Sequence, residues 1–427
     1  MKVLVIGSGA REHALVRALS ADPGVDALVV APGNPGMDAV ALCEPLPGGP
    51  LDSDGVLELT RRHHVDLVVV GPEAPLVAGL ADVLREAGFA VFGPSAAAAR
   101  LEGSKAFAKE VMAAADVPTA MAHLCATAEE VAESLDALGP PYVVKDDGLA
   151  AGKGVVVTED RDEALAHARE CLAREDGRVV VEEFLEGPEV SLFCLSDGRT
   201  VVPLAPAQDF KRVGDEDRGP NTGGMGAYSP LDWLPPTMVD EVVTRVAQPT
   251  VDELAHRGTP FAGLLYVGLA VTRRGPRVIE FNARFGDPET QVVLARLETP
   301  LGRLLHAAAT GQLDSVEALR WSDQHAVTVV VAAHNYPGTP RTGDPVTGLE
   351  ELSGVPTAYG LHAGTARDAD GTLVSAGGRV LSVVALGDSL AQARERVYEA
   401  VDLVGLEGSH HRTDIALAAE RDELHVG

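Results

Sequence analysis

The stretch from Lys145 to Val157, which reads KDDGLAAGKGVVV, constrains the fold more than any other part of this sequence. Its glycines Gly148, Gly152 and Gly154 can adopt backbone angles closed to other residues and let main-chain N–H groups approach an anion. Valine-rich runs on both sides predict two strands. We therefore expect the tip of a β-hairpin, which can fold over a triphosphate as a lid.

Lysine stands at both ends of this glycine loop, although lysine is scarce in the chain. Only six lysines occur among 35 basic residues, and two of them are Lys145 and Lys153. A compact ammonium suits phosphate as a point charge, whereas a guanidinium requires a planar partner. Taken alone, the loop is equally consistent with a solvated surface turn.

Composition limits the classes of protein and partner. A length of 427 residues predicts about three domains, and 46% hydrophobic residues predict an ordinary globular core. The net charge of −28 argues against a nucleic-acid partner. Four widely spaced cysteines without a CxxC pair indicate free thiols in a reducing compartment. No signal peptide or membrane span is recognisable, so we expect a cytoplasmic protein with no membrane partner.

Short apolar runs dominate the first hundred residues, and each ends in a glycine- or proline-rich loop. The predicted strands are 2–6, 27–31, 65–70 and 89–92. Strands that alternate with helical stretches predict an open parallel α/β sheet, with ligands at the carboxyl ends of the strands.

Gly7 and Gly9 begin a GxGxxG pattern, but its third glycine position is Glu12. No acidic residue ends the second strand, where a ribose hydroxyl would need one. The pattern therefore argues against a nicotinamide cofactor. A helix beginning after Gly9, with Arg11 in its first turn, suits a single phosphate instead.

Three further segments carry polar groups. Residues 101–115 predict one helix that contains Lys105. Residues 179–185 predict a strand that could present its backbone to a purine edge, although an edge strand with solvated acids is the simpler interpretation. Residues 203–230 lack periodicity but hold apolar anchors, which favours an irregular substrate loop. The candidate residues in this loop are Asp209, Lys211, Gly223, Gly224 and Gly226.

Residues 261–282 predict a second β-hairpin. On its second strand, alternation places Val278, Glu280, Asn282 and Arg284 on one face. Carboxylate and amide oxygens are suitable ligands for Mg²⁺, and the arginine could take the charge on a transferred phosphoryl group. A solvated sheet face is the alternative, but the polar run FGDPE that follows at 285–289 argues against it.

The last hundred residues predict strands near 326–332, 360–363 and 378–386 and a final helix over 389–404. This α+β segment contains Gly377-Gly378-Arg379 but no obvious catalytic set.

The motifs together resemble the phosphoribosylamine–glycine ligase (glycinamide ribonucleotide synthetase) family of the ATP-grasp superfamily. The resemblance covers nearly the whole chain, and RFGDPE is its most specific motif. The matching motifs are VLVIGSGAREHAL (3–15), GNPG (33–36), GPEAPL (71–76), EGSKAFAK (102–109), DGLAAGKGV (147–155), VEEFLEG (181–187), GPNTGGMGAYSP (219–230), EFNARFGDPE (280–289) and GGRVL (377–381).

The resemblance implies a multidomain α/β and α+β fold. Its parts are an N-terminal α/β substrate domain at 1–101, an ATP-grasp domain at 102–325 with a mobile lid at about 120–190, and a small C-terminal α+β domain at 326–427. It implies that ATP, glycine and 5-phosphoribosylamine react through a glycyl phosphate to give glycinamide ribonucleotide, ADP and phosphate. ATP is then a co-substrate, Mg²⁺ or Mn²⁺ the cofactor, and the protein a monomer or weak homodimer.

Site residues follow from the resemblance by position. For ATP it implies Lys105, Lys145, Gly148, Gly152, Lys153, Gly154, Glu182, Glu183, Phe184, Leu185 and Glu189. For the metal it implies Glu280 and Asn282, and for catalysis Arg284, Asp287 and Lys211. For glycine and phosphoribosylamine it implies Gly9, Arg11, Gly33, Asn34, Gly36, Glu73, Asp209, Gly223, Gly224 and Gly226.

Three positions depart from the pattern of the family. Asp146 replaces the usual alanine and could change how tightly the lid closes, while Met37 and Phe210 replace a common threonine and histidine.

Two other functions stay open. An ATP-grasp ligase or carboxylase for another acid would use the same lysines, and a nucleotide-binding regulatory module would have no use for Glu280, Asn282 and Arg284 together.

Overall fold

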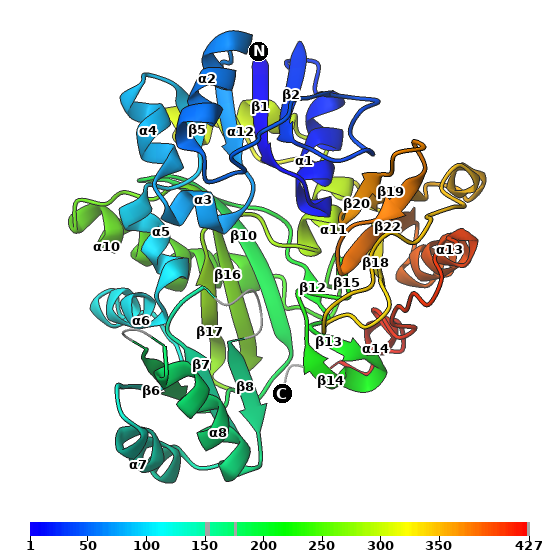
Figure 1. Cartoon of the computed structure of the whole chain (residues 1–427). Helices are drawn as coiled ribbons and strands as arrows, with labels where there is room; N and C mark the ends of the chain where they lie inside the picture. Colours follow the sequence, from blue (N-terminus) through cyan, green and yellow to red (C-terminus); the bar gives the residue numbers. More distant parts are fainter. Residues whose placement is uncertain (150–153, 175–176, 425–427) are drawn as a thin grey trace.

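The computed structural model describes residues 1–149, 154–174 and 177–424. These residues contain four sheets of four or five strands each. In Figure 1 the N-terminal sheet lies at the top, an antiparallel sheet in the centre, a smaller unit at the bottom and the C-terminal sheet at the right. The expected multidomain α/β and α+β architecture is confirmed.

The N-terminal sheet is parallel, as its apolar runs predicted. Residues 3–7 of its central strand are all buried, because helices cover both faces of such a sheet. Its strands, in spatial order, are β3 (Leu42–Cys43), β2 (Ala27–Pro32), β1 (Lys2–Gly7), β4 (Leu67–Val70) and β5 (Ala90–Phe92). Its helices are α1 (Ala10–Ser20), α2 (Ser53–His63), α3 (Glu73–Val77) and α4 (Leu80–Glu86).

The single helix predicted over residues 101–115 is wrong. The chain forms α5 (Ala96–Gly103) and α6 (Lys105–Ala114), separated at Ser104. Ser104 has an extended backbone, and its Oγ accepts a hydrogen bond from the N–H of Phe107 at 3.1 Å. A serine in this role begins a new helix.

The lower unit in Figure 1 contains the predicted glycine hairpin. β7 and β8 are antiparallel, with Lys145 opposite Val155, which confirms the hairpin. The strands are β6 (Ala122–Cys125), β9 (Val179–Glu182), β7 (Tyr142–Asp146) and β8 (Val155–Thr158), and the helices are α7 (Ala128–Leu138) and α8 (Arg161–Leu172). Val131, Leu135 and Val144 belong to a core of this unit that is separate from the larger cores.

The central sheet confirms the second hairpin. Its strands are β11 (Val201–Pro203), β10 (Glu189–Asp197), β16 (Ala262–Thr272) and β17 (Gly275–Asn282). Helix α12 (Leu301–Thr310) packs on β10 and β16 of this sheet. The other helices of this part of the chain are α9 (Met238–Val242), a π-helical turn (Val243–Ala247), α10 (Gln248–His256) and α11 (Glu289–Arg296), which packs against α1.

One face assignment on β17 is wrong. Glu280 pairs with Gly268 while Val278 pairs with Leu269, so Ile279 is an extra residue in a β-bulge. The bulge reverses the alternation, and Val278 is buried in the same core as Phe281 instead of sharing a face with Glu280.

The segment 203–230 is not an irregular loop. Two of its strands join the C-terminal sheet, and two others form a separate ribbon. The C-terminal sheet contains β12 (Gln208–Asp209), β15 (Gly226–Ser229), β18 (His325–Ala332), β22 (Arg379–Gly387) and β19 (Tyr359–His362). The ribbons are β13 (Arg212–Gly214) with β14 (Arg218–Asn221), and β20 (Thr365–Arg367) with β21 (Leu373–Ser375).

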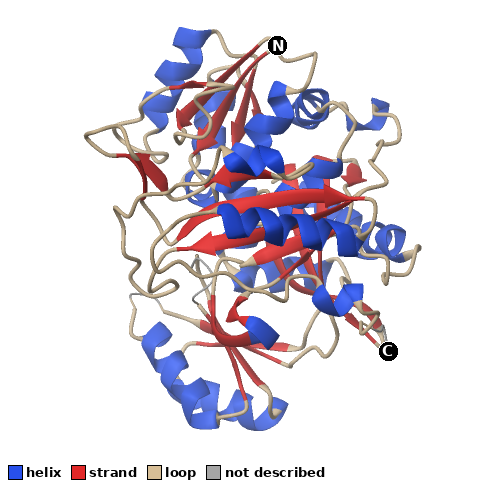
Figure 2. Cartoon of the chain, turned by 90° about the vertical axis from the view of Figure 1, so that its right-hand side faces the viewer, coloured by secondary structure: helices blue, strands red, loops and turns tan. Residues whose placement is uncertain are grey.

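Helix α13 (Leu390–Leu403) packs on β18 and β22 of this sheet, and Figure 2 views that side of the molecule. The short helix α14 (Leu417–Glu420) follows, so the predicted final helix is not the last one. Among the described helices, none is both long and apolar enough to cross a bilayer.

Candidate active site

The first part of the glycine loop is tied to the start of α6. Lys105 Nζ donates to the carbonyl of Gly148 at 3.0 Å. Asp147 Oδ1 accepts from Ser104 Oγ at 3.0 Å and from the N–H of Ala106 at 3.1 Å. The break at Ser104 therefore places Lys105 directly against the loop. Gly152 and Lys153 lie outside the described residues, and Gly154 is the first residue after that gap.

Lys145 belongs to a buried group of three charges. Its Nζ lies 2.9 Å from Glu182 Oε2 and donates to the carbonyl of Ile279 at 3.0 Å. Lys109 Nζ lies 3.2 Å from Glu182 Oε1. Glu182 is only 3% exposed, so this group connects the small sheet to α6 and β17 through charge-assisted contacts. The bulge at Ile279 presents the carbonyl that Lys145 binds.

The adenine segment predicted at 182–185 follows an internal strand. The interpretation of 179–185 as an edge strand with solvated acids is wrong, because β9 lies between β6 and β7 and Glu182 is buried. Glu183 accepts from the N–H of Met121 at 2.9 Å. Phe184 is 45% exposed, which leaves its ring accessible to a planar ligand.

Glu280 and Asn282 continue along β17 as predicted, and neither is fully buried. Four cations act on the Glu280 carboxylate. Burial favours its neutral form, but Lys211, Lys145, Lys105 and Arg284 lower the pKa of Glu280 below its usual value. A carboxylate held in its charged form beside an amide oxygen is a suitable donor pair for a hard cation.

Asp209 and Lys211 lie beside Glu189 at the start of β10. Lys211 Nζ is 2.7 Å from Glu189 Oε2. Burial, together with the charges of Glu289, Glu189 and Glu280, raises the pKa of Asp209 to about 8 despite the opposing effect of Lys211. Burial opposes the charged form of Lys211, but Glu189 and Asp209 raise its pKa well above the usual value. The structure thus brings Asp209 and Lys211 close to Glu280. We call the part of β17 that carries Glu280 and Asn282 the Glu280 face.

Arg284 joins the central sheet to the N-terminal sheet. Its Nη2 lies 3.0 Å from Glu102 Oε1, and its Nε lies 3.2 Å from Glu73 Oε2. The same Glu73 oxygen is 3.9 Å from Arg11 Nη1. Burial favours neutral Glu73, but Arg284 and Arg11 lower the pKa of its carboxyl. Three residues predicted from separate motifs therefore form one network.

Glu12 fills the space beside the first glycine-rich turn. A Cβ at Gly7 would lie 2.6 Å from Glu12 atoms, and one at Gly71 would lie 2.1 Å from Glu12 Oε1. Glu12 also accepts from the N–H of Gly9 at 2.7 Å and pairs with Arg11 Nε at 2.5 Å. Glu12, the residue that breaks the GxGxxG pattern, therefore packs between the turns at Gly7 and Gly71.

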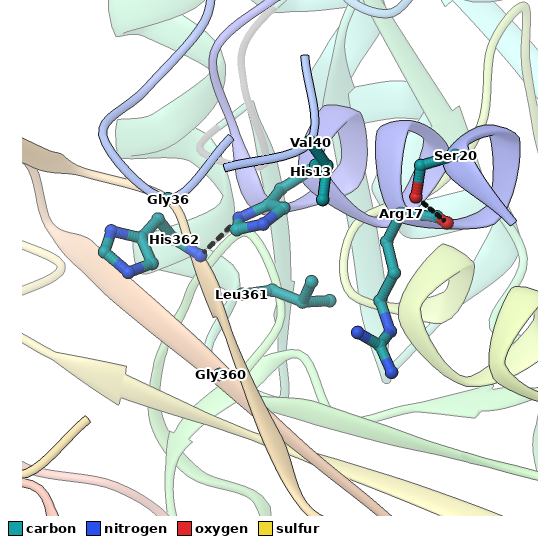
Figure 3. A pocket seen from close by; sticks show the side chains of 8 residues that line it. All are labelled: His13, Arg17, Ser20, Gly36, Val40, Gly360, Leu361 and His362. Carbon is teal, nitrogen blue, oxygen red and sulfur yellow. Dashed lines mark hydrogen bonds between the residues drawn. The ribbon is translucent and has the colours of Figure 1, made fainter. Parts of the chain in front are cut away.

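The loop of Gly33, Asn34 and Gly36 lies at the junction with β19. Asn34 Nδ2 donates to the carbonyls of Ser8 at 2.8 Å and His362 at 2.9 Å. The rings of His13 and His362 pack on Gly36 and border a cavity of about 230 Å³ (Figure 3). In the described part of the chain, no hydrogen bond joins this loop directly to Arg284 or Glu73. The N–H of Gly33 instead donates to the carbonyl of Gly7 at 3.1 Å, in the turn whose Gly9 N–H binds Glu12.

Gly223, Gly224 and Asp287 meet at Arg379, which begins β22 of the C-terminal sheet. Arg379 Nη2 lies 3.2 Å from Asp287 Oδ2, and its Nη1 donates to the carbonyls of both glycines. Gly226 belongs to β15 and pairs with Val329 of β18.

The three departures from the family pattern are accommodated by the fold. Asp146 is buried and forms an ion pair with Arg174, and Met37 is fully buried. The Arg412 guanidinium lies 4.9 Å from the centre of the Phe210 ring, a cation–π contact.

Sequence reasoning missed three residues of these networks. Lys109 lies one helical turn after Lys105, a spacing that places both on one face. Glu102 opens the EGSK motif, and Arg379 ends a glycine pair. The motifs that contain these three residues were recognised, but the residues that their side chains contact are distant in the sequence and could not be identified from it.

Three family models cover most of the chain. They are described as the N domain (residues 1–102), the ATP-grasp (A) domain (103–290) and the C domain (326–418) of phosphoribosylglycinamide synthetase. A phosphoribosylamine–glycine ligase from Streptomyces coelicolor is 66% identical over 421 residues, which are 98% of this chain and 99% of that protein.

Solved structures agree with this assignment. A phosphoribosylamine–glycine ligase from Thermotoga maritima is 32% identical with a TM-score of 0.82, covering 97% of this chain and 100% of that one. A biotin carboxylase domain from Hydrogenobacter thermophilus, solved with MgADP and bicarbonate, shares the fold at 18% identity, with a TM-score of 0.70 over 96% of this chain and 91% of that one. The chain therefore belongs to the phosphoribosylamine–glycine ligase family, whose central part has the ATP-grasp fold.

Proposed function

We propose that this chain joins glycine to 5-phosphoribosylamine, with cleavage of ATP to ADP and phosphate, and so makes glycinamide ribonucleotide in purine biosynthesis. Curated relatives at 49–66% identity carry the name of this ligase over nearly the full chain. The ATP-grasp fold of the central part fits an ATP-dependent ligation.

One feature supports this function above all others: the charges of four cations together lower the pKa of the Glu280 carboxyl. Lys105, Lys145, Lys211 and Arg284 all act on the Glu280 carboxylate. The chain as a whole carries a charge of −28, so such a cluster opposes the overall charge and suits an anionic ligand. A triphosphate and an acyl phosphate are ligands of this kind.

The reaction proceeds in two steps. A glycine carboxylate oxygen takes the γ-phosphoryl group of ATP, which gives glycyl phosphate and ADP. The amine nitrogen of phosphoribosylamine then attacks the acyl carbon, the amide bond forms, the bond to phosphate breaks and the amine loses one proton. No protein nucleophile takes part, so the side chains act by positioning and electrostatics.

The proposed roles are those that the resemblance to the family implies by position. Lys105 and Lys145 bind the ATP phosphates under the 148–154 loop, and residues 182–185 with Glu189 surround the adenosine. Arg284 holds the acyl phosphate, while Asp287 and Lys211 orient the other substrates. The remaining predicted substrate contacts are Gly9, Arg11, Gly33, Asn34, Gly36, Glu73, Asp209, Gly223, Gly224 and Gly226.

Glu280 and Asn282 would hold a divalent cation, Mg²⁺ or Mn²⁺. Their hard oxygen donors fit such an ion when it is also bound by phosphates and water. When bound, the ion neutralises phosphate charge. The biotin carboxylase domain with the same fold was solved with MgADP.

Further proposals concern organisation. The division into parts at 1–101, 102–325 and 326–427 follows the motifs. The four cysteines are free, which supports work in the reducing cytoplasm. A monomer or weak homodimer remains our proposal for its oligomeric state.

The test is ADP release by the purified protein with ATP, Mg²⁺ and glycine, with and without freshly generated phosphoribosylamine. ADP formation that requires both substrates supports the ligase. ADP formation that requires bicarbonate or another acid instead supports the alternative ATP-grasp ligase or carboxylase. ATP binding without turnover on any acid supports a regulatory module.

A further inference from the structure

The C-terminal sheet supplies a side chain that holds two predicted site segments together. Arg379 Nη1 donates to the carbonyls of Gly223 at 2.6 Å, Gly224 at 3.3 Å and Asp287 at 2.8 Å. Its Nη2 lies 3.2 Å from Asp287 Oδ2. One planar guanidinium thus binds three main-chain oxygens and one carboxylate, which an ammonium cannot do with the same geometry.

Tyr336 holds the same turn from its other side. Its hydroxyl accepts a hydrogen bond from the N–H of Gly223 at 3.0 Å. The tyrosine ring lies against Gly378, where a Cβ would come within 2.3 Å of the ring. The glycine pair before Arg379 therefore makes room for Tyr336, and both polar groups of Gly223 are bound by the C-terminal part of the chain.

The turn is also fixed by its own residues. Gly224 has a φ of +108°, and a Cβ there would lie 2.4 Å from the Pro288 ring. Thr222 Oγ1 donates to the carbonyl of Lys211 at 2.8 Å and accepts from the N–H of Gly224 at 2.9 Å. A continuous set of hydrogen bonds therefore runs from Lys211 through the turn to Asp287.

This junction faces the N-terminal sheet. A Cβ at Gly9 would lie 3.8 Å from Asp287 Oδ2, so the Asp287 carboxylate borders the turn that starts α1. The Lys211 end of the hydrogen-bonded set lies beside Glu189 and Glu280 instead. In the proposed function ATP and its metal ion bind at the Glu280 face. We therefore assign the Asp287 end, which borders the N-terminal sheet, to the amine substrate.

We propose that Arg379 and Tyr336 are positioning residues for phosphoribosylamine: they hold the turn at Gly223 and Gly224 and the Asp287 carboxylate in the geometry that orients the amine. This inference rests on the proposed function. A displaced turn would weaken the use of phosphoribosylamine and leave the ATP face unchanged.

The experiment compares Arg379→Ala with wild type in steady-state assays that vary each substrate. We expect kcat/KM for phosphoribosylamine to fall about 10- to 100-fold, while KM for ATP stays within about twofold. Millimolar guanidinium should restore part of the lost rate, and Arg379→Lys should behave like Arg379→Ala because it lacks the planar fork.

Two further variants make the test decisive. Arg367→Ala is the matched control, since Arg367 is exposed in the same part of the chain. Among the described residues its side chain donates only to Gly371, within its own turn, at 3.1 Å. Tyr336→Phe removes one hydroxyl with little change in packing, and it should lower the same kcat/KM to a smaller extent. It tests the proposal even if Arg379→Ala does not fold.

Unchanged kinetics in both Arg379→Ala and Tyr336→Phe would overturn the proposal. An equal loss for all three substrates together with a lowered unfolding midpoint would overturn it as well, because a merely structural role has that signature. Failure of the proposed function is distinguishable, since wild-type protein would then show no ADP release dependent on glycine and phosphoribosylamine.

Discussion

Arg284 lies between two carboxylates that come from different parts of the chain. Glu73 starts α3 of the N-terminal part, and Glu102 lies near the end of α5. Burial opposes the charged form of Arg284, but the charges of Glu102 and Glu73 outweigh burial and raise the pKa of Arg284 above its usual value. The guanidinium is therefore charged and fixed in place before a ligand arrives, as electrostatic catalysis requires.

Replacing Arg284 with alanine should separate catalysis from ATP binding. We expect Arg284→Ala to lower kcat about 100- to 1,000-fold, since in the role proposed above Arg284 is one preorganised donor to the acyl phosphate. The Kd for ATP should stay within about twofold, because Lys105 and Lys145 remain. ADP release and ATP titration calorimetry measure the two quantities.

Arg274→Ala is the control for that variant, because Arg274 lies in the exposed turn between β16 and β17. It should leave both quantities unchanged. A parallel loss of ATP affinity and turnover in Arg284→Ala would contradict the assigned role and indicate a structural one.

Motifs identified many site residues but not their partners. Glu280, Asn282 and Arg284 were recognisable because they alternate within one motif, of which Glu280 and Asn282 end β17 and Arg284 follows it. Glu102 was not recognised as the partner of Arg284, because 182 positions separate them and only the fold brings them within 3.0 Å. The spacing of residues in a sequence predicts which side chains are neighbours within one helix or strand. It does not predict contacts between side chains of different helices and strands.

Elements with local pairing were predictable, and local irregularities were not. Both hairpins followed from valine-rich runs around glycine turns, whose partners are close in the sequence. The break at Ser104 and the bulge at Ile279 each depend on one residue and change a face or a helix boundary. Both irregularities serve the site, because Ser104 positions Lys105 and Ile279 offers its carbonyl to Lys145.

The buried group of Lys109, Lys145 and Glu182 yields a prediction for the small sheet. Glu182→Gln should lower the free energy of unfolding by about 3–5 kcal/mol, because it leaves two lysines without their shared carboxylate. Burial already lowers the pKa of Lys109, and the loss of Glu182 removes the largest opposing charge. Chemical denaturation followed by circular dichroism measures the change.

Glu183→Gln is the matched control for Glu182→Gln. Glu183 lies next in sequence but is less buried, and its closest cation is Arg277 at 3.3 Å. We expect a loss of about 1 kcal/mol or less for this more exposed pair. Equal losses for the two variants would show that the shared carboxylate of Glu182 has no special part in stability.

At the scale of the whole molecule, the sheet that contains β12 and β15 connects distant parts of the chain. Gly226 to Ser229 pair with Val329 to Ala326, about a hundred residues later. This long-range pairing explains why 203–230 lacked a recognisable period, since the strands are two to four residues long. It also means that β18 of the C-terminal part holds β15 of this segment in place.

The junction between α1 and β19 should make stability depend on pH. Burial, with the charges of His362 and Arg17, lowers the pKa of His13 to about 3, and burial lowers that of His362 to about 4. In the unfolded chain the histidine pKa values are near 6.5, so the unfolded state binds more protons than the folded state at mildly acidic pH. The free energy of unfolding therefore falls as the pH drops below 6.5, by up to about 1.4 kcal/mol per pH unit for each histidine. His13→Asn keeps an acceptor for the N–H of His362, 2.9 Å away in the wild type, but cannot be protonated. Its unfolding midpoint should therefore decline less than that of wild type between pH 6.5 and 4.5, while the exposed control His256→Asn should follow wild type. Parallel curves for His13→Asn and wild type would show that the junction does not exclude protons.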